Sequence, residues 1–136
     1  MRGSAVNHGG RANSLTAPNT AAQKALLVQA YRRAGIDPRT VTHIETHGTG
    51  TALGDPVEVN ALKAAFRELY AETPDASYEN EGCWLGAVKS NIGHLELAAG
   101  IAGLAKLLLD LRHGTLAASL HCAEQNPYID LTDSPF

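Results

Sequence analysis

The chain has 136 residues, of which 44% are hydrophobic and 18% charged, so it can bury a core and does not have the composition of a disordered tail. Its net charge of −3 offers neither a basic surface for nucleic acid nor a polybasic anchor for a membrane. The longest apolar run, around 97–109, is too short and too interrupted for a membrane span. No apolar signal region follows Met1, and Cys83 and Cys122 are isolated thiols. These features predict a soluble, cytoplasmic α/β protein or a piece of one.

The N-terminal part is predicted to be a loop followed by a helix. Residues 1–19 are rich in Gly, Asn and Ser, which is typical of loops. Over residues 20–34 apolar side chains recur every four positions, which predicts a helix with one apolar face. Thr20, with Gln23 three residues later, has the pattern of an N-cap, and Gly35 is the expected stop.

The middle of the chain is predicted to contain a strand and a second helix. Residues 41–46 are rich in β-branched side chains and are predicted to form the strand. The helix should follow over about 55–70, with Asp55 as its N-cap and Glu58 in its first turn. Residues 71–82 are polar and irregular, which indicates a surface loop.

A second strand and a long apolar helix are predicted in the C-terminal half. Residues 84–88 should form a short buried strand, and 89–93 a turn. From 94 to 112 the pattern is helical but apolar nearly all round, so this helix should be buried. Gly100 and Gly103 within it indicate that another backbone packs closely there, because glycine is unfavourable in a helix.

The order of these elements predicts an α/β fold. Strands that alternate with helices imply a mostly parallel sheet with right-handed crossover helices. Two strands are too few for a sheet that is stable by itself. The pattern therefore predicts a half-domain that is incomplete on its own.

Two segments repeat one design, in which a strand is followed by a glycine-bearing turn with a histidine and then a helix. The histidines are His47 and His94. The carboxyl ends of parallel strands are where α/β sheets build their sites, so the two rings could share one pocket. A neutral imidazole can donate a hydrogen bond to a developing oxyanion. The alternative is a pair of structural histidines, and the spacing alone leaves both interpretations open.

Nucleotide and metal sites are not expected. After Gly48 and Gly50, the position of the third glycine of a dinucleotide fingerprint is occupied by Leu53. His43 and His47 are four residues apart, as in some zinc proteases, but that chemistry needs a helix and adjacent His-Glu residues. Their segment is instead β-branched and ends in glycine.

Several sequence segments together resemble one family. ETHGTGTALGDPVEVNAL, AVKSNIGHLELAAGIAGLAKLLL and RHGTLAASLH are similar to the C-terminal half of ketosynthase domains of modular polyketide synthases. NHGGRANSLTAPN and QNPYIDL resemble the branch that uses free-standing acyltransferases. The resemblance covers residues 1–136 as one fragment. It implies the thiolase fold, a dimer in the complete domain, and decarboxylative Claisen condensation between an acyl thioester on a cysteine and malonyl on an acyl carrier protein.

The resemblance also implies roles for individual residues. His47 and His94 match the two active-site histidines that help to decarboxylate the malonyl thioester and stabilise the enolate. Lys89 matches a lysine that orders the site through a carboxylate elsewhere in the domain, although it could also be an ordinary surface lysine. Thr49 and Thr51 match threonines at the mouth of the pantetheine channel. No cofactor is expected, because phosphopantetheine arrives on the carrier protein.

The nucleophilic cysteine of the family has no counterpart in this sequence. It lies in an Ala-Cys-Ser type turn of the N-terminal half, and neither Cys83 nor Cys122 is in such a turn. The last strands of the family are expected after Phe136. We therefore expect the chain to need the N-terminal half as a partner and to be inactive alone, or else to be a non-catalytic remnant with a docking or structural role. The remaining histidines are expected to be structural or solvated: His8, His43, His113 and His121.

Overall fold

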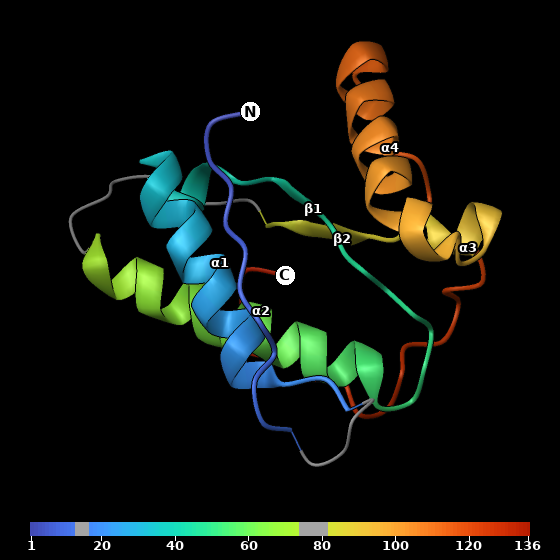
Figure 1. Ribbon diagram of the computed structural model, residues 1–136. Helices are drawn as coiled ribbons and strands as arrows, with labels where there is room; N and C mark the ends of the chain where they lie inside the picture. The colour runs from blue at the N-terminus through green and yellow to red at the C-terminus, as the bar shows by residue number, and fades with distance from the viewer. Residues whose placement is uncertain (13–16, 74–81) are drawn as a thin grey trace.

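The computed structural model describes residues 1–12, 17–73 and 82–136 (Figure 1). Its elements are α1 (Thr20–Ala34), the 3-10 turn η1 (Pro38–Thr40), β1 (His43–Glu45), α2 (Gly54–Glu72), β2 (Trp84–Gly86), α3 (Lys89–Ile92), the 3-10 turn η2 (Glu96–Ala98) and α4 (Ala99–His113). Eight of the residues assigned to the polar loop, 74–81, lie outside the described residues. In the described parts, no helix is long and apolar enough to cross a membrane.

The two strands form a parallel pair, as predicted, with α2 as the crossover between them. His43 is paired with Trp84, and Glu45 with Gly86. Each strand has three residues, fewer than the patterns of 41–46 and 84–88 predicted. Figure 1 shows α1 and α2 on one side of this small sheet and α4 on the other.

The α1–α2 pair holds the main apolar core. Val28 of α1 packs with Ala65 and Leu69 of α2, and all three are buried. Phe66 is fully buried, with its ring edge-to-face against Tyr31 at a centroid distance of 5.3 Å. The predicted apolar face of the first helix therefore has its partner within this chain.

The ends of α1 agree with the sequence pattern except for the identity of the N-cap. Asn19, rather than Thr20, is the cap, and its side chain accepts a hydrogen bond from the backbone N–H of Ala22. The expectation for Thr20 was wrong by one residue, since either type can cap and the helix starts at Thr20 itself. Gly35 ends the helix with φ of 59°, in the left-handed region that favours glycine.

The start of α2 also differs from the expectation. The helix begins at Gly54, and Leu53 at its N-cap makes no side-chain capping bond. Asp55, expected to be the cap, lies inside the first turn, where its carboxylate accepts a hydrogen bond from the N–H of Gly50. The expected cap is wrong because this carboxylate binds the preceding loop instead of the helix terminus.

The segment after β2 is more helical than expected near its start and less so around His94. Lys89–Ile92, part of the predicted turn, form the single helical turn α3. The long helix begins at Ala99, after η2, and not at His94. Gly93 has φ of 76°, a conformation that interrupts the helix and separates α3 from His94.

Helix α4, expected to be a buried helix in a half-domain that is incomplete on its own, is covered on one side only in this chain. Its buried residues form a single stripe: Ala99, Gly103, Lys106 and Asp110. Large apolar side chains elsewhere on it are exposed: Ile101, Leu104, Leu108, Leu109 and Leu111. Figure 1 shows that its C-terminal part projects away from the rest of the molecule. The chain covers one side of a helix whose sequence is apolar on several sides.

The two glycines of α4 differ in their surroundings. A Cβ atom at Gly103 would lie 3.1 Å from Cγ of Glu45, so the close approach expected there exists, although with a side chain. Outside its own helix turn, a Cβ at Gly100 would have no atom of the described residues within 4 Å. The expected close backbone approach at Gly100 is therefore not present within this chain.

Candidate active site

The two motif histidines lie together, as their positions after β1 and β2 predicted. The ring centroids of His47 and His94 are 5.4 Å apart, with an angle of 84° between the ring planes. The segments that carry them are brought together by the parallel pairing of β1 and β2. The predicted convergence of the two histidines is thus present in the folded chain.

The loop that carries His47 is held by a carboxylate of α2. Glu58 accepts hydrogen bonds from the backbone N–H groups of His47 (2.6 Å) and Gly48 (2.9 Å). Gly48 has φ of 50°, and a Cβ atom there would lie 2.6 Å from that of Ala87. Glycine is therefore needed at position 48 both for its backbone conformation and for the close approach to the segment after β2.

Lys89 contacts His47 directly. Its Nζ donates a hydrogen bond to the backbone oxygen of His47 and lies 3.2 Å from Nδ1 of the ring. The resemblance implied that this lysine acts through a carboxylate elsewhere in the domain. Among the described residues, the Lys89 ammonium group instead bonds to His47 through both the backbone and the ring. Lys89 therefore joins the start of α3 to the loop after β1.

In both rings, Nδ1 is the nitrogen that accepts a hydrogen bond. The ammonium group of Lys89 can only donate, so Nδ1 of His47 is the acceptor. Nδ1 of His94 accepts a hydrogen bond from the backbone N–H of Glu96 at 2.9 Å. These contacts assign the proton of each neutral ring to Nε2, and this N–H has no hydrogen-bond partner among the described residues.

The pKa of His47 is lowered from its ordinary value, mainly because the ring is partly shielded from water and then because of the positive charge of Lys89. Both effects favour the neutral imidazole. His94 lies five residues before the start of α4 and not at its N-terminus. The ring of His94 is oriented by the N–H of Glu96 instead.

His47 and His94 are both exposed residues in this chain. Beside His47 is an open pocket of about 360 Å³ between the strand ends and α4, lined in part by Lys89, Gly100 and Leu104. It is open because α4 covers only one side of it. We expect the imidazoles to be buried in the complete domain.

The two threonines of the glycine loop are tied to the start of α2. Thr49 Oγ1 and Thr51 Oγ1 are 3.1 Å apart, and both residues are exposed. Thr51 accepts a hydrogen bond from the N–H of Gly54, and Thr49 donates to Asp55. Both hydroxyl groups thus help to define the shape of the loop at the edge of the site.

Three residues that support the site were not expected from the sequence. Glu58 was assigned to the first turn of α2, and its contact with the histidine loop was not anticipated. Glu45 and Lys106 form an ion pair between β1 and α4 with an Nζ–Oε2 distance of 2.7 Å. A single lysine within an apolar helix was the signal for this pair, because a buried cation needs a partner.

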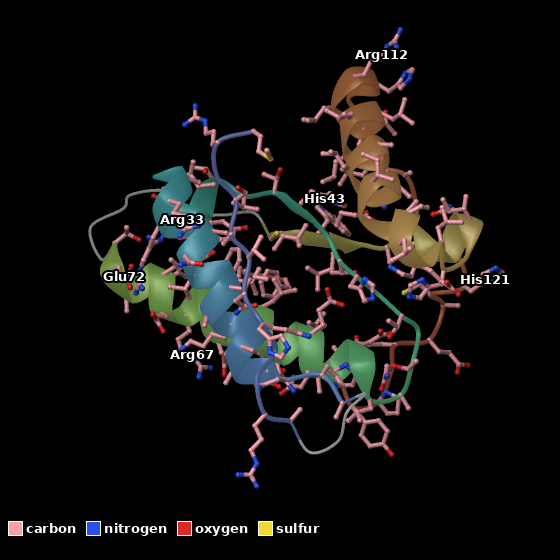
Figure 2. The ribbon with its side chains drawn as sticks, viewed as in Figure 1. Arg33, His43, Arg67, Glu72, Arg112 and His121 are labelled. Atoms are coloured by element: carbon pink, nitrogen blue, oxygen red, sulfur yellow. The ribbon has the colours of Figure 1, made fainter. Side chains whose placement is uncertain are left out.

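Cys83 does not have the environment of a nucleophile. Cys83 is buried, and burial raises its pKa to about 11, which disfavours the reactive thiolate. Cys122 is exposed in the C-terminal segment. Of the histidines outside the motifs, His43 is mostly buried beside Glu45 of the same strand, whereas His121 points outward (Figure 2). His8 and His113 are also exposed.

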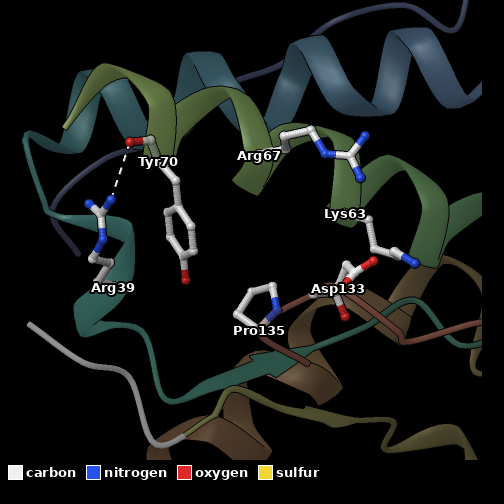
Figure 3. A pocket seen from close by; sticks show the side chains of 7 residues that line it. Arg39, Lys63, Arg67, Tyr70, Asp133 and Pro135 are labelled. Atoms are coloured by element: carbon white, nitrogen blue, oxygen red, sulfur yellow. Dashed lines mark hydrogen bonds between the residues drawn. The ribbon is translucent and has the colours of Figure 1, made fainter. Parts of the chain in front are cut away.

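A second pocket, of about 460 Å³, lies between α2 and the C-terminal segment (Figure 3). Two of its three cationic side chains are already bound to backbone oxygens. Arg39 donates to the carbonyl of Tyr70, and Lys63 to those of Asp130 and Thr132. The bonds of Lys63 therefore anchor the C-terminal segment to α2. The pocket is separate from the histidines.

The chain is similar to known proteins along its whole length. The chain is 63% identical over 136 residues to "Polyketide synthase PksN" of Bacillus subtilis (strain 168) and covers 2% of that protein. It is 48% identical over 136 residues to "Polyketide synthase PksL" of the same strain and covers 3% of it. The chain therefore spans only a small part of the curated relatives that it matches.

Solved ketosynthase structures match the fold. An oxazolomycin ketosynthase domain, OzmH KS7, of Streptomyces albus JA3453 is 44% identical, with a TM-score of 0.88 over 99% of this chain and 23% of that structure. The ketosynthase from module 6 of the bacillaene synthase of Bacillus subtilis 168 is 38% identical, with a TM-score of 0.86 over 98% of this chain and 23% of that structure. These matches confirm the predicted thiolase-like α/β fold. They also show that the chain corresponds to about a quarter of a ketosynthase structure.

A protein-family model identifies which part of a ketosynthase the chain represents. Residues 1–123 match the model described as "Beta-ketoacyl synthase, C-terminal domain". The match agrees with the similarity of the motifs around His47 and His94 to ketosynthases. The chain belongs to the beta-ketoacyl synthase C-terminal domain family and is a ketosynthase segment of the polyketide-synthase type.

Proposed function

We propose that this chain supplies His47 and His94 to a ketosynthase that catalyses decarboxylative Claisen condensation, with a nucleophilic cysteine from the rest of the domain. The observation that carries the proposal is the pair of rings, 5.4 Å apart, each with Nδ1 occupied and Nε2–H free to donate. Two such donors at the ends of adjacent strands suit a single oxyanion.

In the proposed reaction, the thioester oxygen of malonyl-carrier protein accepts hydrogen bonds from the two Nε2–H groups. The C–C bond to the carboxylate breaks and CO₂ leaves. The electron pair of that bond forms an enolate, with negative charge on the thioester oxygen. The enolate carbon then attacks the acyl thioester on the cysteine. A new C–C bond forms, the C–S bond breaks, and the cysteine sulfur leaves as thiolate. Neutral histidines are suited to this role, and burial and Lys89 both lower the pKa of His47.

The other site residues have supporting roles in this proposal. Lys89 holds the loop of His47 and favours its neutral ring. Thr49 and Thr51 lie at the mouth of the channel through which phosphopantetheine brings the malonyl group, so the chain needs no cofactor of its own. The complete domain is a cytoplasmic dimer in an assembly with free-standing acyltransferases. An acyl carrier protein is its partner. A non-catalytic remnant would leave the paired Nε2–H donors without a role.

The test compares the chain alone with the complete domain that contains it. Each is incubated with an acyl thioester and malonyl-carrier protein and is analysed by intact-protein mass spectrometry. The complete domain should be acylated at its own cysteine and form the elongated product, and the chain alone should remain unmodified. Stoichiometric acylation of Cys83 or Cys122, or an acylated domain that never elongates, would contradict the proposal.

A further inference from the structure

The ion pair between Glu45 and Lys106 is buried directly behind the candidate site. Their side chains are 5% and 7% exposed. A second glutamate–lysine pair, Lys24 with Glu68, has a similar distance of 2.6 Å, but its side chains are 37% and 35% exposed. Removing two charges from water is costly and is offset only by good geometry and further hydrogen bonds. The buried pair therefore requires further stabilising interactions, whereas the exposed pair does not.

The second oxygen of the Glu45 carboxylate makes such an interaction. Oε2 accepts from Lys106, and Oε1 accepts a hydrogen bond from the backbone N–H of Val88. Val88 directly precedes Lys89, and Glu45 lies two residues before His47. One carboxylate thus joins β1, the start of α3 and the helix α4. These are the elements next to the three candidate site residues.

The chain leaves space for this arrangement with two glycines. A Cβ atom at Gly86 would lie 2.7 Å from Cε1 of His43 and 2.8 Å from Nζ of Lys106. A Cβ at Gly103 would lie 3.1 Å from Cγ of Glu45. The ring of His43, labelled in Figure 2, lies beside the pair, with its Nε2 3.8 Å from Oε2 of Glu45. Side chains larger than glycine at 86 or 103 would displace the carboxylate.

We propose that Glu45, with Lys106 as its counter-ion, is a positioning residue for condensation. Its bond to the N–H of Val88 fixes the start of α3, so that Lys89 holds His47 at the distance from His94 that a shared oxyanion requires. This inference rests on the proposed function. Because the pair acts through the histidines, it should affect decarboxylation and should leave acylation of the cysteine unchanged.

Two double variants in the complete domain isolate the hydrogen bond to Val88. E45Q/K106M and E45M/K106M both remove the two buried charges and replace them with side chains of similar size, a change that buried ion pairs often tolerate. They differ in whether residue 45 can accept from the N–H of Val88. E45M/K106M should release CO₂ from malonyl-carrier protein on the order of tenfold more slowly than E45Q/K106M, the effect of one lost hydrogen bond. Cysteine acylation should be equal in both.

Hydrogen exchange gives a second readout that does not depend on activity. The amides of 88 and 89 should exchange about tenfold faster in E45M/K106M than in E45Q/K106M, with amides of α2 unchanged in both. The exposed pair serves as the control, because E68Q and K24M should alter neither the exchange at 88 and 89 nor the ratio of CO₂ release to acylation.

Two outcomes would overturn the inference. One is equal exchange at Val88 in the two double variants. The other is a loss of acylation in parallel with CO₂ release, which would indicate a general loss of folded enzyme. If the wild-type domain releases no CO₂, the proposed function fails, and the exchange at Val88 still decides whether Glu45 orders the start of α3.

Discussion

Helices α1 and α2 on one side of the sheet and helix α4 on the other differ in how they use apolar residues. The α1–α2 pair buries its apolar faces within the chain, with Val28, Ala65 and Phe66 at 3% exposure or less. Helix α4 has the more apolar sequence, yet Ile101 and Leu108 on it are 64% and 58% exposed. The apolar core between α1 and α2 is formed within this chain, whereas α4 presents an apolar surface that fits a missing partner.

The candidate site lies on the incomplete side. His47, His94 and the pocket beside them face the region that the chain leaves open. Because the chain spans 23% of the ketosynthase structures that it matches, the remaining three quarters of the domain can cover α4 and close the pocket. The exposure of α4 and of the histidines therefore has a common explanation. Both are surfaces that the rest of the ketosynthase should bury.

The largest effect on stability is expected in the complete region. Phe66 is fully buried and packs against Tyr31, Tyr70 and Phe136. Phe66→Ala should cost about 3–5 kcal/mol, because the remaining side chains cannot fill the cavity. Hydrogen exchange of the α1–α2 amides should reveal the loss both in the chain alone and in the complete domain. Unchanged protection of these amides would contradict the assignment of this pair as the core.

The effect of Leu108→Ala should depend on whether the partner is present. In the chain alone the side chain is 58% exposed, so the substitution should change stability little. In the complete domain it should cost about 2–5 kcal/mol if this face of α4 is covered. Thermal unfolding of the two forms provides the measurement. An equally small effect in both would show that this face of α4 remains exposed.

Without its partner, the chain should associate through the same face of α4. Exposed apolar patches of this kind favour association in a soluble chain. Sedimentation at several concentrations should show growth in size, and Ile101→Lys with Leu108→Lys should reduce it. A sharply cooperative monomer, independent of concentration, would contradict the half-domain interpretation.

The smallest predicted effect concerns the charge of His47. Lys89→Met removes a nearby positive charge, so the pKa of His47 should rise toward its ordinary value. In the wild-type chain the lowered pKa means that the unfolded chain binds more protons than the folded chain just below pH 6.5. His47 therefore opposes folding increasingly as the pH falls through this range. An NMR titration of the imidazole measures the change, and a lower pKa in the variant would contradict the assigned role of Lys89.

The sequence predicted much of the fold and the centre of the site. The parallel strands, the three long helices and the approach of His47 to His94 follow from patterns local to each segment. The motifs also matched those of ketosynthases. The number of strands that a stable sheet needs indicated that a partner was required.

What the sequence did not predict depends on contacts between distant segments. Glu58 was expected only to start a helix, and its bonds to the backbone of His47 and Gly48 exist only in the folded chain. The bond from Glu45 to Val88 likewise joins residues 43 positions apart. Which residues of α4 the chain covers and which it leaves exposed could not be predicted from its composition, since the helix is apolar nearly all round.

Substitution of the two histidines in the complete domain tests the proposed function most directly. His47→Ala and His94→Ala should each slow release of labelled CO₂ from malonyl-carrier protein by about 10²–10³-fold, the usual effect of losing one oxyanion donor. Acylation of the cysteine, followed separately by intact-protein mass spectrometry, should remain nearly normal, because the acyl thioester is transferred before the enolate forms. Near-normal CO₂ release and elongation in either variant would contradict the account and would assign that histidine a structural role.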